Sequence, residues 1–288
     1  MEFNDVKFEL IRYWLSNDPL KELLSYTTNT GTLINEKETI KDLGVMLSNS
    51  GKFDCHIDKV IDTVKRLTSW VLRSFESRCP QVMITLWKTI VLPHLEYCSQ
   101  LWCPIQKGQI QRLEALQWSY LRKIKGNNNA NYWESLSKFR LYSLQRRRER
   151  YRIIYLWKIL EGLVPNLVGS HGEIVSSIHH RLGRKCNIRN DKSDTSSTNI
   201  CNLRKASFSM HSTQLFNSLP RDIRNISMCS VPHFKCSLDA FMSSIPDEPL
   251  IIGYTHLRRA PSNSILDMVE WMRQNLKAGG SNASTWTS

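Results

Sequence analysis

The sequence predicts a mainly α-helical protein with a small β layer at its N-terminus. Beyond residue 50, apolar residues recur at helical spacing through several long stretches. Before residue 50, short apolar runs are separated by turn residues. The 288 residues are 41% hydrophobic and 23% charged, which suits a folded chain with a sizeable core. This composition excludes a wholly disordered chain and a collagen-like one.

The N-terminal β segment covers residues 1–50. Residues 8–13 form a short apolar-rich run that predicts a strand. The sequence Asn29-Thr30-Gly31 predicts a turn between two further short runs. Residues 39–47 predict another strand, in which Gly44 indicates a bulge or a close approach of another backbone. A layer of this size is too small to fold alone.

A helical domain is predicted over residues 51–168. Its first helix begins near Asp54 and places apolar residues on one face at a spacing of 3.6. A second helix starts at Pro80 and is ended or kinked by Pro93. A third helix extends over residues 109–124. The domain is thus predicted to resemble a helical bundle.

A fourth helix, residues 144–160, has an unusual composition. Arginines cover every side of its first turns, and apolar residues cover nearly every side of its later turns. A helix that is apolar all round is buried. We therefore expect its C-terminal half in the core and its N-terminal end at the surface, with Gly162 and Pro165 ending the helix.

The C-terminal part is predicted to be organised around a polar segment. Residues 169–202 are rich in turn formers and predict a mobile linker. Residues 203–277 predict a small helical domain, with helices at 231–244 and 265–276. Residues 278–288 are Gly-, Ser- and Thr-rich and predict a disordered tail.

The charge predicts a polyanionic partner. The formal net charge is +13, and residues 104–160 contain thirteen basic and three acidic side chains. Such clustering favours nucleic acid, although basic helix faces can also serve solubility alone. A heptad stripe, the end of the third helix and the arginine run supply the candidate phosphate contacts: Lys59, Arg66, Arg73, Arg122, Lys123, Lys125, Arg146, Arg147, Arg148 and Arg150.

Membrane and metal sites are not predicted. No apolar stretch approaches the length of a membrane span, and the charged N-terminus does not resemble a secretory signal. We expect a soluble intracellular protein of the nucleus or cytoplasm with reduced cysteines. Cys229, His233 and Cys236 have an unusual spacing and supply only three of the four ligands that a structural zinc needs.

Several ordered segments together resemble the reverse transcriptases of jockey-like non-LTR retrotransposons. Each segment alone is a weak signal, but their order within residues 1–245 is specific. They begin with Lys41-Asp-Leu-Gly-Val45, continue with His56-Ile57 and the run from Leu86 to Pro104, and end with Ile110 to Gln117, Leu141 to Arg148 and Leu215 to Pro220.

The resemblance implies the region after the catalytic palm: a primer grip that includes Lys41, Leu43 and Gly44, a helical thumb and a C-terminal extension. The complete enzymes use Mg²⁺ held by carboxylates, including an adjacent aspartate pair. None of the twelve aspartates here is adjacent to another. The resemblance therefore implies a fragment without palm and fingers that has no catalytic residue, no cofactor and no enzymatic activity of its own. It implies sequence-nonspecific binding of an RNA and DNA template–primer duplex.

Two alternatives remain open. The chain could supply half of a polymerase in trans to a separate palm-bearing chain, which predicts exposed apolar residues in the β layer. It could instead be a host-retained protein-interaction module, whose binding would be insensitive to salt. If Arg146, Arg147 and Arg148 contact phosphates, their change to glutamine should reduce the salt slope by about one to two and barely affect thermal stability.

Overall fold

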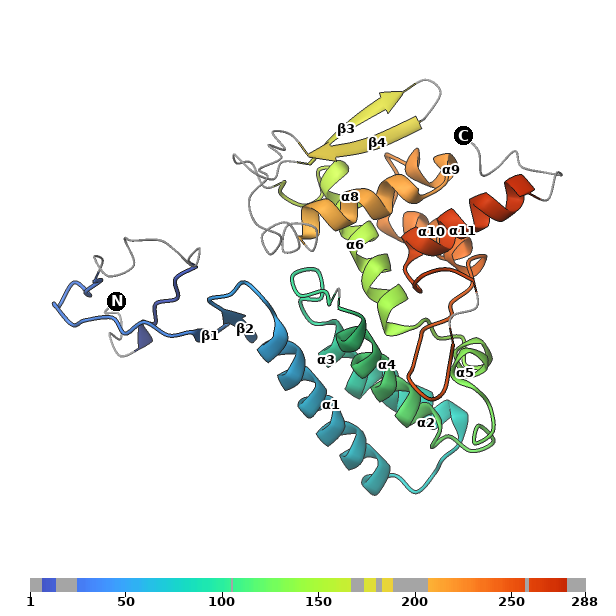
Figure 1. The fold of residues 1–288 in the computed structure, drawn as a ribbon, viewed down its shortest axis with the longest axis horizontal. Coiled ribbons are helices and arrows are strands. Elements are labelled where there is room, and N and C mark those ends of the chain that lie inside the picture. The colour runs from blue at the N-terminus through green and yellow to red at the C-terminus, as the bar shows by residue number, and fades with distance from the viewer. Residues whose placement is uncertain are drawn as a thin grey trace. The chain divides into compact units, whose positions relative to one another are not determined.

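A computed structural model describes residues 7–13, 25–104, 106–166, 174–179, 183–188, 207–256 and 259–278. Within these residues the protein is mainly helical, with a small two-stranded antiparallel sheet near the N-terminus (Figure 1), which confirms the predicted fold class. The chain divides into two units, Met1–Thr63 and Val64–Ser288. The boundary therefore falls within the first long helix and not at residue 50.

The sheet of the first unit is a tight hairpin. Strand β1 (Thr39–Asp42) pairs antiparallel with β2 (Val45–Ser48), and Asp42 lies opposite Val45. The two turn residues have positive φ angles, 43° at Leu43 and 90° at Gly44, as two-residue hairpin turns require. The single strand predicted over residues 39–47 is thus wrong, because Gly44 forms a turn and not a bulge.

The other strands expected before residue 39 are reduced to single bridges. Leu10 bridges Glu36, and Thr27 bridges Leu33 across the predicted turn. Helix α1 (Asp54–Ser74) follows the hairpin and has the predicted apolar face. Its buried members are Ile57, Val60 and Ile61 in the first unit, and Val64 and Val71 in the second.

The second helical stretch passes through its proline. Helix α2 (Pro80–Leu86) continues as a π-helical segment, η3 (Trp87–Val91), and then as α3 (Leu92–Glu96). Pro93 lacks an N–H and its ring crowds the preceding turn of an α-helix. A π-helical turn accommodates such an interruption, so Pro93 does not end the helical stretch.

Three helices form the middle of the second unit. They are α4 (Lys107–Leu121), α5 (Tyr132–Lys138) and α6 (Leu144–Leu160). Helix α5 was not predicted, since its seven residues are too few to show a period. Its start is nevertheless marked by a capping box, in which the Asn131 side chain accepts from the Glu134 N–H and the Glu134 side chain accepts from the Asn131 N–H.

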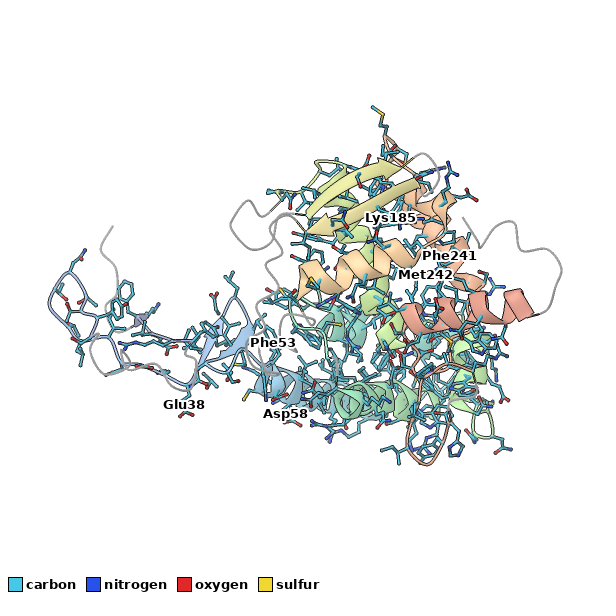
Figure 2. The ribbon with its side chains drawn as sticks, turned by 45° about the horizontal axis from the view of Figure 1, so that its top comes forward. Glu38, Phe53, Asp58, Lys185, Phe241 and Met242 are labelled. Carbon is cyan, nitrogen blue, oxygen red and sulfur yellow. The ribbon has the colours of Figure 1, made fainter. Side chains whose placement is uncertain are left out.

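The segment predicted as a linker contains a β-hairpin. Strand β3 (Ile174–His179) pairs antiparallel with β4 (Gly183–Ile188), which carries Lys185 (Figure 2). The side chain of Asn217 accepts from the backbone N–H of Cys186 at 2.9 Å and donates to its carbonyl at 2.8 Å. This amide extends the ladder of β4, so residues 174–179 and 183–188 are a hairpin and not a linker, and the other residues of the predicted linker 169–202 lie outside the described residues.

The remaining elements are helices. They are α8 (Phe208–Ser218), α9 (Arg221–Arg224), α10 (Val231–Ser243) and α11 (Ile265–Ala278). Helices α10 and α11 begin where the sequence predicts them. The predicted tail lies outside the described residues from residue 279 onward. Among the residues that the structure describes, no helix has both the length and the apolar character needed to cross a membrane.

One core joins α6 to the C-terminal helices. The apolar half of α6 packs with α8, α10, α11 and the β3–β4 hairpin (Figure 1), and α10 contributes Phe241 and Met242 (Figure 2). The indole of Trp157 stacks on the ring of Phe234 with centroids 4.5 Å apart. Residues 203–277 are therefore part of the same unit as α6, and the separate C-terminal domain is corrected.

Candidate nucleic-acid interface

The arginine run at the start of α6 is largely buried. Arg146 is 0% exposed and Arg148 is 2% exposed. The guanidinium of Arg146 donates hydrogen bonds to the carbonyl oxygens of Ile245, at 3.3 Å, and Pro246, at 2.7 Å. The prediction that Arg146 and Arg148 contact phosphates from the surface is wrong, because neither side chain reaches solvent.

The two flanking arginines are engaged in ion pairs. Arg147 donates to the carboxylate of Glu96, and Arg150 forms a bidentate pair with Asp239 at 2.5 and 2.6 Å. Bidentate arginine–carboxylate pairs are among the stronger ion pairs of proteins. Because these acids neutralise Arg147 and Arg150, the run connects α6 to its neighbours and contributes little positive surface.

Two buried acidic side chains connect the start of α6 to other elements. Glu114 accepts hydrogen bonds from the hydroxyl of Tyr132 at 2.6 Å and from the backbone N–H groups of Leu144 and Gln145, which open α6. Burial raises the pKa of Glu114. Glu149 accepts from the backbone N–H of Ile265 at 2.7 Å, and burial raises its pKa as well.

The basic stripe of α1 is exposed as predicted. Lys59, Arg66 and Arg73 are spaced by seven residues, so they share one side of the helix. Lys59 belongs to the first unit, where its ammonium contacts the Met46 sulfur at 3.7 Å, and the two arginines belong to the second. All three side chains are exposed.

The residues assigned to a primer grip lie at the tip of the β1–β2 hairpin. Lys41 is exposed on β1, and Leu43 is 84% exposed in the turn. Gly44 completes the turn with its φ of 90°. These three residues are therefore brought together by local hairpin geometry.

A further basic surface is formed where α4 and α5 end. The exposed side chains of Lys123 and Lys125 follow α4, and those of Lys138 and Arg140 end and follow α5. The Lys138 ammonium donates to the Gly126 carbonyl at 2.7 Å, which brings the two helix ends together. We call these four residues the α4–α5 basic surface. Sequence reasoning missed Lys138 and Arg140, although both contribute to the charge excess of residues 104–160.

Arg122 borders this surface but is held by aromatic rings. Its guanidinium lies 5.6 Å from the ring centroid of Trp118 and 5.0 Å from that of Tyr254, whose hydroxyl accepts from it at 3.2 Å. Such contacts fix the position of the cation. Tyr254 is 52% exposed, so an aromatic face stands beside the cations of the α4–α5 basic surface.

A half-buried histidine makes the stability of the same unit depend on pH. Arg152 donates to Nδ1 of His211 at 3.2 Å, which requires that nitrogen to be an acceptor. Burial, with a smaller effect of Arg152, lowers the pKa of His211 to about 4 from its ordinary value of 6.5. Between these values the unfolded chain binds more protons, so stability is complete above pH 6.5 and is lost as the pH falls towards 4.

The substitution His211→Gln should abolish this dependence, since an amide can accept from Arg152 and does not titrate. We expect the difference in unfolding free energy between wild type and variant to change by about 3 kcal/mol from pH 7.5 to pH 4. Urea unfolding at several pH values measures it. Parallel pH profiles for the two proteins would contradict the assignment of the titrating group to His211.

Metal ligands do not converge in the described part of the chain, where no three His, Cys, Asp or Glu side chains are grouped to hold an ion. His233 and Cys236 are exposed on the first turns of α10, and Cys229 precedes that helix.

No family model matches this chain, and no curated protein or solved structure matches it either.

Proposed function

We propose that the chain binds nucleic acid through the sugar–phosphate backbone and that the α4–α5 basic surface makes the main contact. The observation that carries this proposal is the convergence of four exposed cations at two adjoining helix ends. Lysine and arginine that neutralise phosphates supply most of nonspecific affinity. Because such contacts read no base edges, we expect little sequence preference.

The sequence resemblance gives this binding a context. In a reverse transcriptase the region after the palm holds a template–primer duplex by its backbone, and we propose a similar role here for an RNA–DNA hybrid. The exposed stripe on α1 and the hairpin tip at Lys41 and Leu43 are available as additional contacts. The proposal assigns no catalytic step to this chain.

The test is the salt dependence of binding to a labelled RNA–DNA hybrid, followed by fluorescence anisotropy. Lys123→Gln, Lys125→Gln and Lys138→Gln combined should reduce the magnitude of the slope of log K against log salt by about two to three. Each lysine that contacts a phosphate accounts for about 0.9 of the slope on a duplex. Binding to duplex DNA should weaken in parallel, since both helices present phosphates.

A matched control changes Lys52, Lys88 and Lys235 to glutamine. This variant has the same net charge, but its substitutions are scattered over other elements. It should keep a slope close to that of wild type. Equal slopes for the two triple variants would show that net charge and not the α4–α5 basic surface governs binding, and would refute the proposal. A third variant changes Lys59, Arg66 and Arg73 to glutamine. If only this variant reduces the slope, the binding site lies on α1 and not on the α4–α5 basic surface.

A protein partner is the second candidate, and one observation favours it. Among the described residues of the first unit, Tyr13 and Leu33 are each 58% exposed and Tyr26 is 48% exposed. Exposed apolar groups of this kind are typical of surfaces that other chains cover. The second candidate would be supported by complexes whose affinity is insensitive to salt, whereas the first requires a steep dependence.

A further inference from the structure

The two edges of the β3–β4 hairpin differ in how their backbone groups are used. Strand β4 packs along α8 and α9, and β3 is the outer strand (Figure 1). The side chain of Asn217 accepts from the N–H of Cys186 and donates to its carbonyl. Asn225 accepts from the N–H of Arg184, and Arg224 donates to the carbonyl of Arg184. The groups that these two β4 residues turn away from β3 are therefore bonded.

The outer edge of β3 follows from the same ladder. Ser176 and Ile178 lie opposite the two β4 residues just described, so their own N–H and C=O groups point away from β4. Ile174 shows the same alternation, since the Asn166 side chain accepts from its N–H at 3.3 Å and donates to its carbonyl at 2.7 Å. Among the residues that the structure describes, nothing bonds the outward groups of Ser176 and Ile178. Asn166 thus occupies this edge as a third strand would, and the edge is open beyond it.

The open edge adjoins a pocket of about 440 Å³, whose wall includes Ser176, Ile178, Leu160 and Met228. Ser176 is exposed, Ile178 is 82% exposed and Met228 is 98% exposed. Residues that face each other on neighbouring strands direct their side chains to the same side of a sheet. Side chains opposite Ser176 and Ile178 on an added strand would therefore lie over this pocket, where apolar groups find apolar contacts.

The charge of the hairpin restricts the partner. Residues 174–188 contain three basic side chains and no acidic one. Arg184 is paired with Glu161 at 2.6 Å, whereas Lys185 (Figure 2) has no ion pair within the described residues. Lys185 lies opposite Ser177, on the other face of the sheet from the pocket. An added residue opposite Ser177 would share that face, about 10 Å from Lys185 across a short side chain. An acidic residue suits this position, and a second copy of the hairpin would bring like charges together.

We propose that β3 binds an extended peptide of another protein as an additional antiparallel strand, and that this peptide has an acidic residue between two apolar ones. The apolar residues lie opposite Ser176 and Ile178, exchange backbone hydrogen bonds with both and cover the pocket. The acidic residue lies opposite Ser177 and faces towards Lys185. In strand addition, the main chain supplies affinity and the alternate side chains supply specificity. This inference does not depend on nucleic-acid binding.

The experiment measures binding of the full chain to a fluorescein-labelled peptide, Thr-Val-Glu-Val-Thr, by fluorescence anisotropy. In a second peptide both valines are N-methylated, which removes the N–H groups that would pair with the carbonyls of Ser176 and Ile178. In a third, matched peptide only the glutamate is N-methylated, because its N–H points away from β3. Methylated valines should raise Kd about tenfold or more, and methylated glutamate less than about threefold. Lysine in place of the glutamate should raise Kd about fivefold.

A pair of variants tests the edge from the side of the protein. Ile178→Pro removes the outward N–H, and proline is tolerated on an edge strand at such a position. Ile178→Thr keeps that N–H. The proline variant should lose binding of the peptide, and the threonine variant should stay within about fivefold of wild type.

The outcomes that would overturn the proposal are measured mainly on the wild-type chain. They are equal affinity for the parent and the valine-methylated peptide, equal or tighter binding of the lysine peptide, and no binding of the parent peptide at about 1 mM. Sedimentation of the chain alone tests the remaining occupant. A wild-type dimer that becomes a monomer with Ile178→Pro would assign the edge to a second copy and would refute the peptide.

Discussion

Replacing Arg146 with glutamine should lower the free energy of unfolding by about 3 kcal/mol, because two buried acceptors lose a charged donor. Arg146 is 0% exposed and bonds to the carbonyls of Ile245 and Pro246. Glutamine is too short to reach both. The substitution also removes a positive charge close to Glu149, whose pKa Arg146 helps to hold down against burial. Urea unfolding followed by tryptophan fluorescence measures the loss.

The control is Lys123→Gln, which removes one positive charge from an exposed position beyond α4. Its effect should stay within about 0.5 kcal/mol of wild type. This pair reverses the expectation from sequence that charge removal in the arginine run leaves stability almost unchanged. If Arg146→Gln unfolds at the wild-type urea concentration and only its affinity for nucleic acid falls, the buried position of Arg146 is wrong.

Replacing Glu114 with leucine should cost about 3–5 kcal/mol of unfolding free energy, since it leaves several buried donors without an acceptor. The lost partners are the Tyr132 hydroxyl and the N–H groups of Leu144 and Gln145. These groups belong to α5 and to the first turn of α6. The change therefore weakens two helices at once, and urea unfolding followed by circular dichroism measures it.

Glu114→Gln provides the matched comparison. Its carbonyl oxygen keeps an acceptor while its NH₂ group faces the remaining donors, so we expect an intermediate loss of about 1–2 kcal/mol. Burial raises the pKa of Glu114, and a group of this kind stabilises the fold below its unfolded pKa and less as the pH rises through its folded pKa. The loss caused by Glu114→Leu should accordingly be larger at pH 5 than at pH 8. A leucine variant no less stable than the glutamine variant would contradict the network.

Sequence periodicity predicted the helices whose first residues carry a local signal. Helices α1, α6, α10 and α11 begin at Asp54, Leu144, Val231 and Ile265, where apolar spacing or a capping residue marks the start. The β3–β4 hairpin was not predicted because apolar and polar residues do not alternate cleanly along its strands. Its register depends instead on Asn217 of α8 and on packing against that helix, which short-range patterns do not contain.

The candidate interface was predicted only in part for a related reason. Lys123, Lys125 and the stripe on α1 are exposed because each lies at a helix end or on the polar side of an amphipathic helix. The arginine run looks equally basic in the sequence. Its burial is decided by acceptors far along the chain, such as Asp239 for Arg150 and the carbonyl of Pro246 for Arg146. Composition gives the number of charges but not their partners.

The late position of these partners has a consequence for synthesis on the ribosome. Arg146 of α6 donates to the carbonyl of Ile245, 99 positions further along, and the side chain of Ser143, which caps the helix, accepts from Asn263, 120 positions further along. Until that stretch leaves the exit tunnel, Arg146 and Glu149 must stay hydrated, and the first turns of α6 cannot enter a core. Closure of this unit therefore waits until this stretch has been made, and a chain truncated before residue 245 lacks these partners and cannot complete it.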